Sequence, residues 1–305
     1  MDRALRRLPG LVAAVGGVVA ATGVLWRPSG RPIAVTTPRG RIAHLAGDGL
    51  YRYDTVFTAA GNTAVDTVVL ALGIPLVVRA WLDHRARSPR GTLLLAGSLG
   101  YLLYVYATYA FGVAYNPLYL AYVTLFCGSL FGFVAAMAAA DRAVLAAVAA
   151  NPDVPHRSLS RFLLVSAAVT AAVWLQQLVP ALLRGAAPPL LDVYTTTVTY
   201  SLDLAVVAPS AALAGVLVRR REPLGYLLAA PLLVTVVALL PTISLSTLLQ
   251  AAAGISFTPA EVIGPIVGFG VLGMWGARLL LRLLRAVPTT APTSRDEVLD
   301  ADVHP

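Results

Sequence analysis

The sequence predicts an all-α membrane protein, a bundle of about eight transmembrane helices with a small external hairpin. Of the 305 residues, 58% are hydrophobic and 12% are charged, whereas about 25% of residues are charged in a typical soluble domain. The mean hydropathy is +0.76, and the apolar residues gather in long, nearly uncharged runs. This composition excludes a soluble globule and a disordered chain, because so much apolar surface collapses or inserts into lipid.

Eight runs are long enough to cross a bilayer, which takes about 20 helical residues. They lie at residues 9–26, 62–82, 90–112, 117–140, 161–183, 197–218, 223–250 and 259–281. The first run follows three arginines, as a secretory signal does, but Trp26 and Arg27 stand where small residues would mark a cleavage site. We interpret it as a retained helix, so residues 1–287 are expected to form one membrane domain.

The distribution of arginine predicts the orientation. With the N-terminus in the cytoplasm, the inner side receives 17 of the 23 arginines, and cytoplasmic loops carry such an excess. Both termini are therefore predicted to lie in the cytoplasm, on the inner side of a bacterial plasma membrane. Topology then accounts for the formal charge of +8, and no nucleic-acid partner is predicted.

Several helix ends carry capping signals. Ser88-Pro89, Asn116-Pro117 and Thr258-Pro259 each place a polar side chain before a proline suited to the first helical position. Glu261 would complete a capping box at the last of these starts. Gly254 is suited to end the seventh helix in the left-handed conformation.

Two segments lie outside the predicted spans. The longest loop, residues 28–61, holds two short β-prone runs on either side of Pro38-Arg39-Gly40, a pattern typical of a hairpin. The tail, residues 288–305, is rich in proline and threonine and then acidic, without an apolar pattern. We expect the tail to be disordered in the cytoplasm.

A faint internal similarity suggests two halves of four helices each. The segments beginning at Ser88 and Glu222 share a Pro-x-Gly pattern, and each follows a span with one carboxylate, Asp66 or Asp203. An even number of spans would give both halves the same orientation, an arrangement in which binding sites commonly lie between the halves. The alternative is that proline and glycine simply mark helix starts.

Asp66 and Asp203 are the main candidates for ligand or ion binding, since a carboxylate in hydrocarbon is costly unless paired or hydrated. Asp66 also has a structural interpretation, because Thr63 to Asp66 has the pattern of a capping box. For Asp203, the hydroxyls of Thr199 and Tyr200, one turn earlier, are expected donors. If the halves pack as repeats, the two carboxylates would face each other and share a proton or hold a cation.

Seven of the twelve tyrosines lie between residues 101 and 122. On the fourth helix, Tyr115, Tyr119, Tyr122 and Phe126 follow a helical spacing that puts them on one face. Along the third helix, Tyr101, Tyr104 and Tyr109 approach the same outer turn. Hydroxyls at membrane depth need partners, so these helices are expected to pair and to line a polar cavity. Tyr104, Tyr119 and Tyr122 are the candidate ligand contacts, and an aromatic packing seam is the alternative.

Gln177 makes the fifth helix a further candidate contact. Trp174 and Pro180 lie nearby, and polar groups or prolines inside a span are tolerated where they face protein or water. The entrance to the site would be formed by the external segment that precedes the second helix: Tyr51, Arg52, Tyr53 and Asp54.

Catalytic chemistry is less favoured by the sequence. All four histidines lie in predicted loops or the tail, so the predicted spans hold no Ser/His pair and no H-E-x-x-H zinc arrangement. The chain has no lysine for a phosphate-binding Walker loop, and its single cysteine, Cys127, offers no disulfide or cysteine metal site. No cofactor or metal is predicted, and the expected partners are the lipid bilayer and a small molecule or ion.

Three stretches, with Asp66 and Pro75 between the first two, carry a resemblance to known sequences: Gly49–Phe57 (GLYRYDTVF), Gly100–Tyr104 (GYLLY) and Ala114–Tyr119 (AYNPLY). In these stretches the chain resembles a family of uncharacterised bacterial multi-pass integral membrane proteins. The likeness continues through residues 199–209 and 223–230 and so covers most of the chain. It implies an integral membrane protein and carries over no catalytic residue.

Three classes of function follow from these observations. The leading one is a transporter or permease-like protein whose polar core binds a small solute or ion through Asp66 or Asp203. A membrane-embedded enzyme that uses the same carboxylates is the first alternative, either an aspartyl-type hydrolase or a lipid-modifying transferase. The Gly-x-Gly-Asp motif of intramembrane aspartyl proteases is missing, however. The second alternative is a scaffold or sensor that acts through the external loop.

Overall fold

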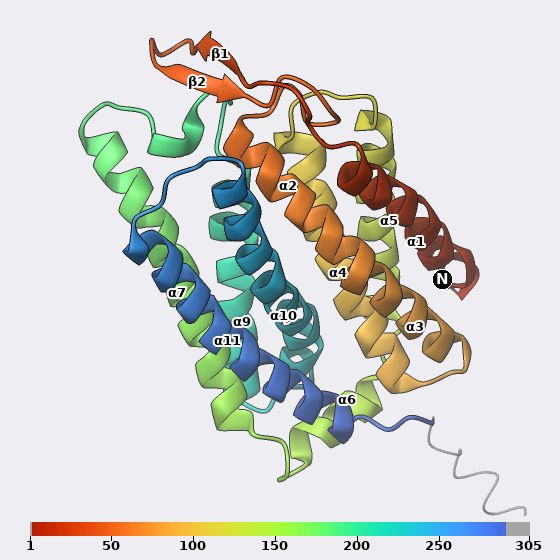
Figure 1. Cartoon of the computed structure of the whole chain (residues 1–305). Coiled ribbons are helices and arrows are strands. Elements are labelled where there is room, and N and C mark those ends of the chain that lie inside the picture. The colour runs from red at the N-terminus through yellow and green to blue at the C-terminus, as the bar shows by residue number, and fades with distance from the viewer. Residues whose placement is uncertain (1, 291–305) are drawn as a thin grey trace, which may run out of the picture.

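Eight long apolar helices and a two-stranded hairpin make up the computed structural model, which describes residues 2–290 (Figure 1). The spans in chain order are α1 (Asp2–Leu25), α2 with η1 and α3 (Val56–Val68, Val69–Gly73, Ile74–Arg85), α4 (Pro89–Gly112), α5 (Tyr119–Ala138), α7 (His156–Leu183), α8 with η3 and α9 (Val198–Leu202, Asp203–Val207, Ala208–Arg219), α10 (Pro223–Ala252) and α11 (Pro259–Ala286). The short helix α6 (Arg142–Ala150) and a 3-10 turn, η2 (Pro189–Leu191), lie between spans. The predicted fold class is confirmed.

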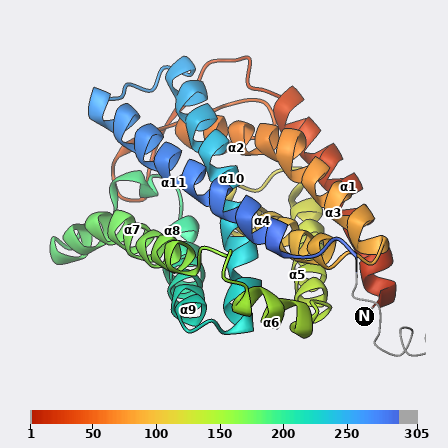
Figure 2. The same cartoon turned by 90° about the horizontal axis from the view of Figure 1, so that it is seen from below.

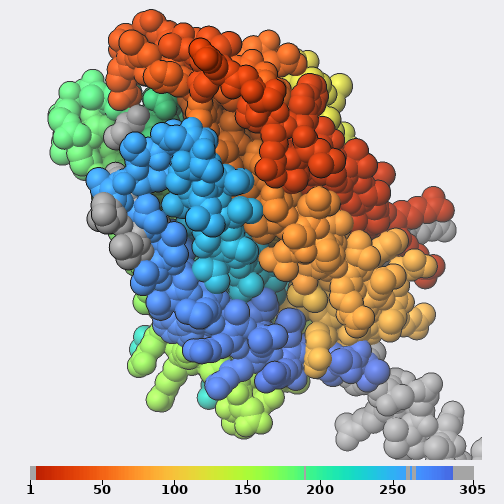
Figure 3. All heavy atoms as spheres, viewed as in Figure 1, coloured from red at the N-terminus to blue at the C-terminus, as the bar shows by residue number. Residues whose placement is uncertain are grey.

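The hairpin lies at one end of the bundle. Strands β1 (Ile33–Thr36) and β2 (Ile42–Leu45) pair antiparallel, with Ile33 opposite Leu45. The turn between them uses Gly40 at a φ of +73°, in the left-handed region that favours glycine. Figure 3 shows this segment spread over the end of the bundle, so the predicted hairpin is confirmed.

Some predicted helix signals are confirmed. The Ser88 hydroxyl accepts from the Gly91 amide at 3.2 Å and caps α4, and Gly254 follows α10 with a φ of +88°. The capping role of Glu261 concerns a side chain outside the described part of the structure. Likewise, residues 291–305 of the predicted disordered tail lie outside the described residues.

Other boundaries differ from the prediction. Asn116 does not cap α5, because its side chain accepts from the Leu118 amide at 2.9 Å and the helix begins later, at Tyr119. Two histidines predicted to lie in loops, His84 and His156, belong to helices, since α3 and α7 extend further than their apolar cores. A span with a polar end is longer than its hydropathy indicates.

The largest correction concerns the second span, which begins at Val56 rather than near residue 62. The Thr55 side chain caps it by accepting from the Thr58 amide at 3.2 Å. Asp66 therefore lies inside the helix, where the backbone amides are already paired. The interpretation of Asp66 as part of a capping box is wrong.

The turn between the second and third spans recurs between the sixth and seventh. Arg87 and Arg221 both have a φ of +58°, which is uncommon for residues other than glycine. In both turns the amide of the next residue donates to the carbonyl five residues earlier, at N···O distances of 3.1 and 2.9 Å. Such a bond is typical of helices that end in a left-handed residue.

Both turns also need a glycine at the matching position of the next helix. A Cβ on Gly91 would lie 2.6 Å from the backbone carbon of Asp83, and one on Gly225 would lie 2.6 Å from the backbone nitrogen of Val218. In each half, the start of the third span therefore lies directly against the backbone at the end of the second.

The second span of each half also has the same interruption. The π-helical turns η1 and η3 are each followed, after one residue, by a proline, Pro75 or Pro209. Proline lacks an N–H and its ring crowds the carbonyl four residues earlier. The residue before it bonds instead to the carbonyl five residues back, Ile74 to Val69 and Ala208 to Asp203.

All these pairs are the same number of residues apart, which supports the duplication of four helices. The shared register shows that Asp66 and Asp203 are not equivalent, however, since Asp203 begins its π-turn and Asp66 precedes the other π-turn by three residues. The third spans of the two halves, α4 and α10, pack against each other at the centre (Figure 2). Parallel repeats related by an axis along the membrane normal would meet in this way.

Candidate functional site

Asp66 lies inside α2 and is 1% exposed. The Tyr51 hydroxyl, from the loop after the hairpin, donates to its Oδ2, and the Tyr109 hydroxyl of α4 lies 3.1 Å from its Oδ1. Burial raises the pKa of Tyr51, so this phenol keeps its proton. Among the side chains that the structure describes, the only ion pair joins Arg79 and Asp83, and the hydrogen-bond partners of the Asp66 carboxyl are neutral hydroxyls.

Helix α1 closes the site on a further side. Gly23 faces Asp66 so closely that a Cβ there would lie 1.7 Å from Oδ2 and 3.0 Å from the Tyr51 hydroxyl. The absence of a side chain at Gly23 makes room for the carboxyl. Four separate parts of the chain, namely α1, the Tyr51 loop, α2 and α4, thus enclose one carboxyl group.

Four buried tyrosines pack around this carboxyl. Tyr109 is central, with ring centroids at 6.4 Å from Tyr51, 6.0 Å from Tyr106 and 5.2 Å from Tyr122, all edge to face. Edge-to-face packing is favourable for aromatic rings beyond the burial of their area. Tyr122 therefore lies beside the Asp66 site, whereas Tyr119 packs against the exposed Tyr115 at 5.4 Å.

The hydrogen bonds around Asp66 accommodate a proton on the carboxyl. Tyr109 has one hydroxyl proton but two acceptors within reach, the Asn62 carbonyl at 3.0 Å and Asp66 Oδ1 at 3.1 Å. If Asp66 is protonated, it can donate to Tyr109 while Tyr109 donates to Asn62, and both acceptors are satisfied. The hydrogen bonds at this site can thus accommodate Asp66 in either its protonated or its ionised form.

Asp203 has a separate set of partners. The Tyr104 hydroxyl of α4 donates to Oδ1 at 2.9 Å, and the Trp174 indole of α7 donates to Oδ2 at 2.7 Å. Trp174 stacks on Tyr200 with centroids 4.0 Å apart, and the Tyr200 hydroxyl donates to Gln177 at 3.0 Å. The structure therefore brings together three predicted residues, Asp203, Tyr104 and Gln177.

Two expectations about Asp203 are corrected. Tyr104 and Trp174 donate to it, whereas the expected donor Tyr200 bonds Gln177 instead. The two carboxylates also do not form a shared pair, because each has its own donors. Their α4 donors, Tyr104 and Tyr109, are five positions apart, which places them about 140° apart around the helix.

The segment predicted as an external entrance is largely closed. Tyr51 and Asp54 are buried at 2% and 0% exposure, Tyr53 is exposed, and Arg52 lies over the Tyr53 ring. Asp54 Oδ1 accepts from the Ala114 amide at 3.0 Å and from the Tyr194 hydroxyl at 2.8 Å. Asp54 thus joins three loops at the hairpin end.

Burial raises the pKa of Asp54 from 3.8 to about 6, which predicts a pH-dependent stability. The unfolded chain releases this proton at a lower pH than the folded chain, so the stability falls as the pH rises between these two values. An Asp54→Asn variant keeps the Oδ1 acceptor and stays neutral. We expect it to be more stable than the wild type at pH 8, by about 2–3 kcal/mol, and nearly equal at pH 4.

Thermal unfolding of the two proteins in detergent at pH 4 and pH 8 checks this expectation. A stability difference between them that is the same at both pH values would contradict it.

The fold and the site define a multi-pass helical membrane protein with buried aspartates that accept hydrogen bonds from tyrosines. No family model matches the chain, and comparisons with characterised proteins and with solved structures found no significant match. Its function is therefore argued from the site itself.

Proposed function

We propose that the protein is a transporter in which Asp66 and Asp203 bind and release a proton as a small solute crosses the membrane. The observation that carries this proposal is the matched interruption of two spans, each with a carboxylate at or within one turn of it, Asp66 buried and Asp203 partly buried. Interrupted helices at corresponding positions of two halves are typical of transporter binding sites, and π-turns often lie at functional sites.

The partners of the carboxylates favour a proton over a metal cation. A hard cation needs several oxygen atoms that point lone pairs at it. Here the groups aimed at Asp66 and Asp203 are hydroxyls and an indole N–H, and an indole N–H can only donate. Such donors stabilise a carboxylate after it has lost its proton, without a counter-ion.

Helix α4 is the element shared by both carboxylates, since Tyr104 and Tyr109 bond one each. A change at one π-turn that moves its carboxylate would break a bond to α4, and α4 packs on α10 of the other half. In our proposal, this contact between α4 and α10 couples the two carboxylate sites. Because Asp66 is buried, we take this conformation of the transporter to be the one closed to both sides of the membrane.

The same geometry does not favour an aspartyl enzyme. Such an enzyme needs two carboxylates that share one proton or flank one bond, and the donors of Asp66 and Asp203 lie on different faces of α4. No observation favours a scaffold or sensor role over transport.

Proton flux into vesicles tests the proposal. The purified protein is reconstituted with a pH-sensitive dye inside, a pH gradient is imposed, and candidate solutes are added in turn. We expect wild-type vesicles to carry protons faster than protein-free vesicles, and Asp66→Asn and Asp203→Asn each to lower this flux, because an amide cannot exchange the proton.

Asp153→Asn, in an exposed turn between α6 and α7, is the matched control and should leave the flux unchanged. Retention of wild-type flux by both Asp66→Asn and Asp203→Asn, at equal protein content, would overturn the proposal.

A further inference from the structure

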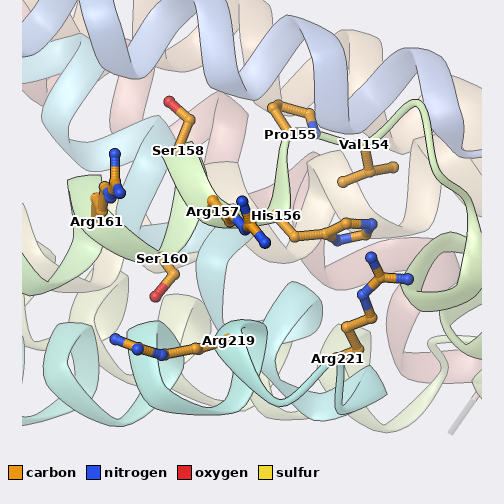
Figure 4. A pocket seen from close by; sticks show the side chains of 9 residues that line it. All are labelled: Val154, Pro155, His156, Arg157, Ser158, Ser160, Arg161, Arg219 and Arg221. Carbon is orange, nitrogen blue, oxygen red and sulfur yellow. The ribbon is translucent and has the colours of Figure 1, made fainter.

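A basic pocket lies at the end of the bundle opposite the hairpin, between the start of α7 and the end of α9. Its volume is about 890 Å³. Four arginines line it, Arg157 and Arg161 from α7, Arg219 from α9 and Arg221 from the turn after α9. Figure 4 shows Arg221 pointing toward His156, which begins α7. No acidic side chain belongs to the lining.

The four guanidinium groups have no ion-pair partner among the side chains described in the structure, where the only salt bridge is that of Arg79 with Asp83. Like charges gathered around one cavity repel each other, and a bound anion removes this cost. The planar fork of arginine matches the oxygens of phosphate particularly well. The start of α7 adds the positive end of a long helix on the same side.

His156 has a structural part in this pocket. Its Nε2 lies 2.8 Å from the Asn151 carbonyl, which only accepts, so Nε2 carries the hydrogen. Its Nδ1 then accepts from the Tyr226 hydroxyl at 2.6 Å. Both ring nitrogens are occupied, and the anion-binding groups are the arginines.

The surface beside the pocket indicates where the anion comes from. On each of the two helices, exposed apolar residues lie three or four positions apart in line with an arginine of the pocket. These are Val165 and Val169 beyond Arg161 on α7, and Leu213 and Val216 before Arg219 on α9. In a membrane span such exposed apolar side chains face lipid tails. A lipid that lies along these side chains would bring its headgroup to the arginines.

We propose that this pocket binds the phosphate headgroup of an anionic phospholipid, whose acyl chains lie along α7 and α9. Basic pockets between the ends of membrane helices bind such headgroups in other proteins. In the first half, three arginines near the corresponding turn have other partners: Arg85 stacks on Trp81, Arg79 pairs with Asp83, and Arg90 donates to the Val287 carbonyl.

Lipid-dependent stability and native mass spectrometry test the proposal. The full chain in detergent is mixed with phosphatidylglycerol or phosphatidylcholine, and the retained lipid and the unfolding temperature are measured. We expect one phosphatidylglycerol to be retained in preference to phosphatidylcholine and to raise the unfolding temperature. The variant with Arg157, Arg161, Arg219 and Arg221 all changed to glutamine should lose this preference. The double variant R157Q/R219Q serves if the fourfold variant does not fold.

The matched control is R85Q/R87Q, at the positions of the first half that correspond to Arg219 and Arg221, and it should keep the preference. Equal retention of both lipids by the wild type, or an unchanged preference in the pocket variants, would overturn the proposal. Stabilisation by inorganic phosphate to the same degree as by phosphatidylglycerol would also overturn it, since the site would then belong to a soluble anion.

Discussion

Replacing Gly23 by alanine is expected to destroy the Asp66 site. The new methyl group would lie 1.7 Å from Asp66 Oδ2 and 2.5 Å from its carboxyl carbon, distances that no side chain tolerates. Either α1 moves away from α2, or the carboxyl turns and loses the Tyr51 hydroxyl. Overpacking of this kind costs about 1–3 kcal/mol, and a buried partner left without its hydrogen bond costs about as much again.

The expected result is a protein that unfolds at a markedly lower temperature and carries no protons in the vesicle assay. Gly17→Ala is the matched control on the same helix, because nothing lies within 4 Å of a Cβ there. Alanine is also the better helix former, so the control should be at least as stable as the wild type. If the Gly23 and Gly17 variants behave alike, the close contact between α1 and Asp66 is not present in the protein.

Gly91→Ala should prevent the close packing of α4 against the end of α3, and Gly225→Ala should prevent that of α10 against the end of α9. In each case the Cβ would lie about 2.6 Å from backbone atoms of the preceding helix, and backbone cannot rotate away as a side chain can. We expect each variant to be strongly destabilised, by about 3 kcal/mol or more at the upper end of overpacking costs, or to fail to assemble.

Because the two turns are equivalent in the duplicated halves, the two variants should lose similar amounts of stability. Gly268→Ala on α11 is the control, since a Cβ there meets nothing within 4 Å. Thermal unfolding and the yield of monodisperse protein in detergent measure both effects. Strong destabilisation of one glycine variant with a neutral effect of the other would contradict the equivalence of the two turns.

The spans themselves could be predicted from sequence, because a bilayer demands a long apolar run whatever the tertiary structure. The start of the second span could not, since Thr55 to Thr63 is polar for a membrane helix. In the structure that segment is helical, with its polar groups buried or bonded to the helix backbone: Asn62 and Thr63 are buried, and the Thr63 hydroxyl donates to the Ala59 carbonyl. A hydropathy sum does not register whether a polar side chain is buried inside the bundle or bonded to its own helix.

Asp66 and Asp203 could be predicted as unusual residues, but their partners could not. Tyr51 reaches Asp66 because a loop folds back into the bundle, and Trp174 reaches Asp203 from the neighbouring span α7. Both contacts depend on how each helix is rotated, which the spacing within one helix does not determine.

One signal in the sequence could have fixed how the two halves align. Pro75 and Pro209 are separated by the same interval as Pro89 and Pro223. This shared interval sets the register of the two halves and shows that Asp203 lies three positions later than the counterpart of Asp66.

The central claim is that Asp66 exchanges a proton inside the membrane, and the most direct test compares proton flux in vesicles that contain wild-type or Asp66→Asn protein. The proposal predicts that the variant, folded and present in equal amount, lowers the flux to that of protein-free vesicles. Equal flux through both proteins would contradict it.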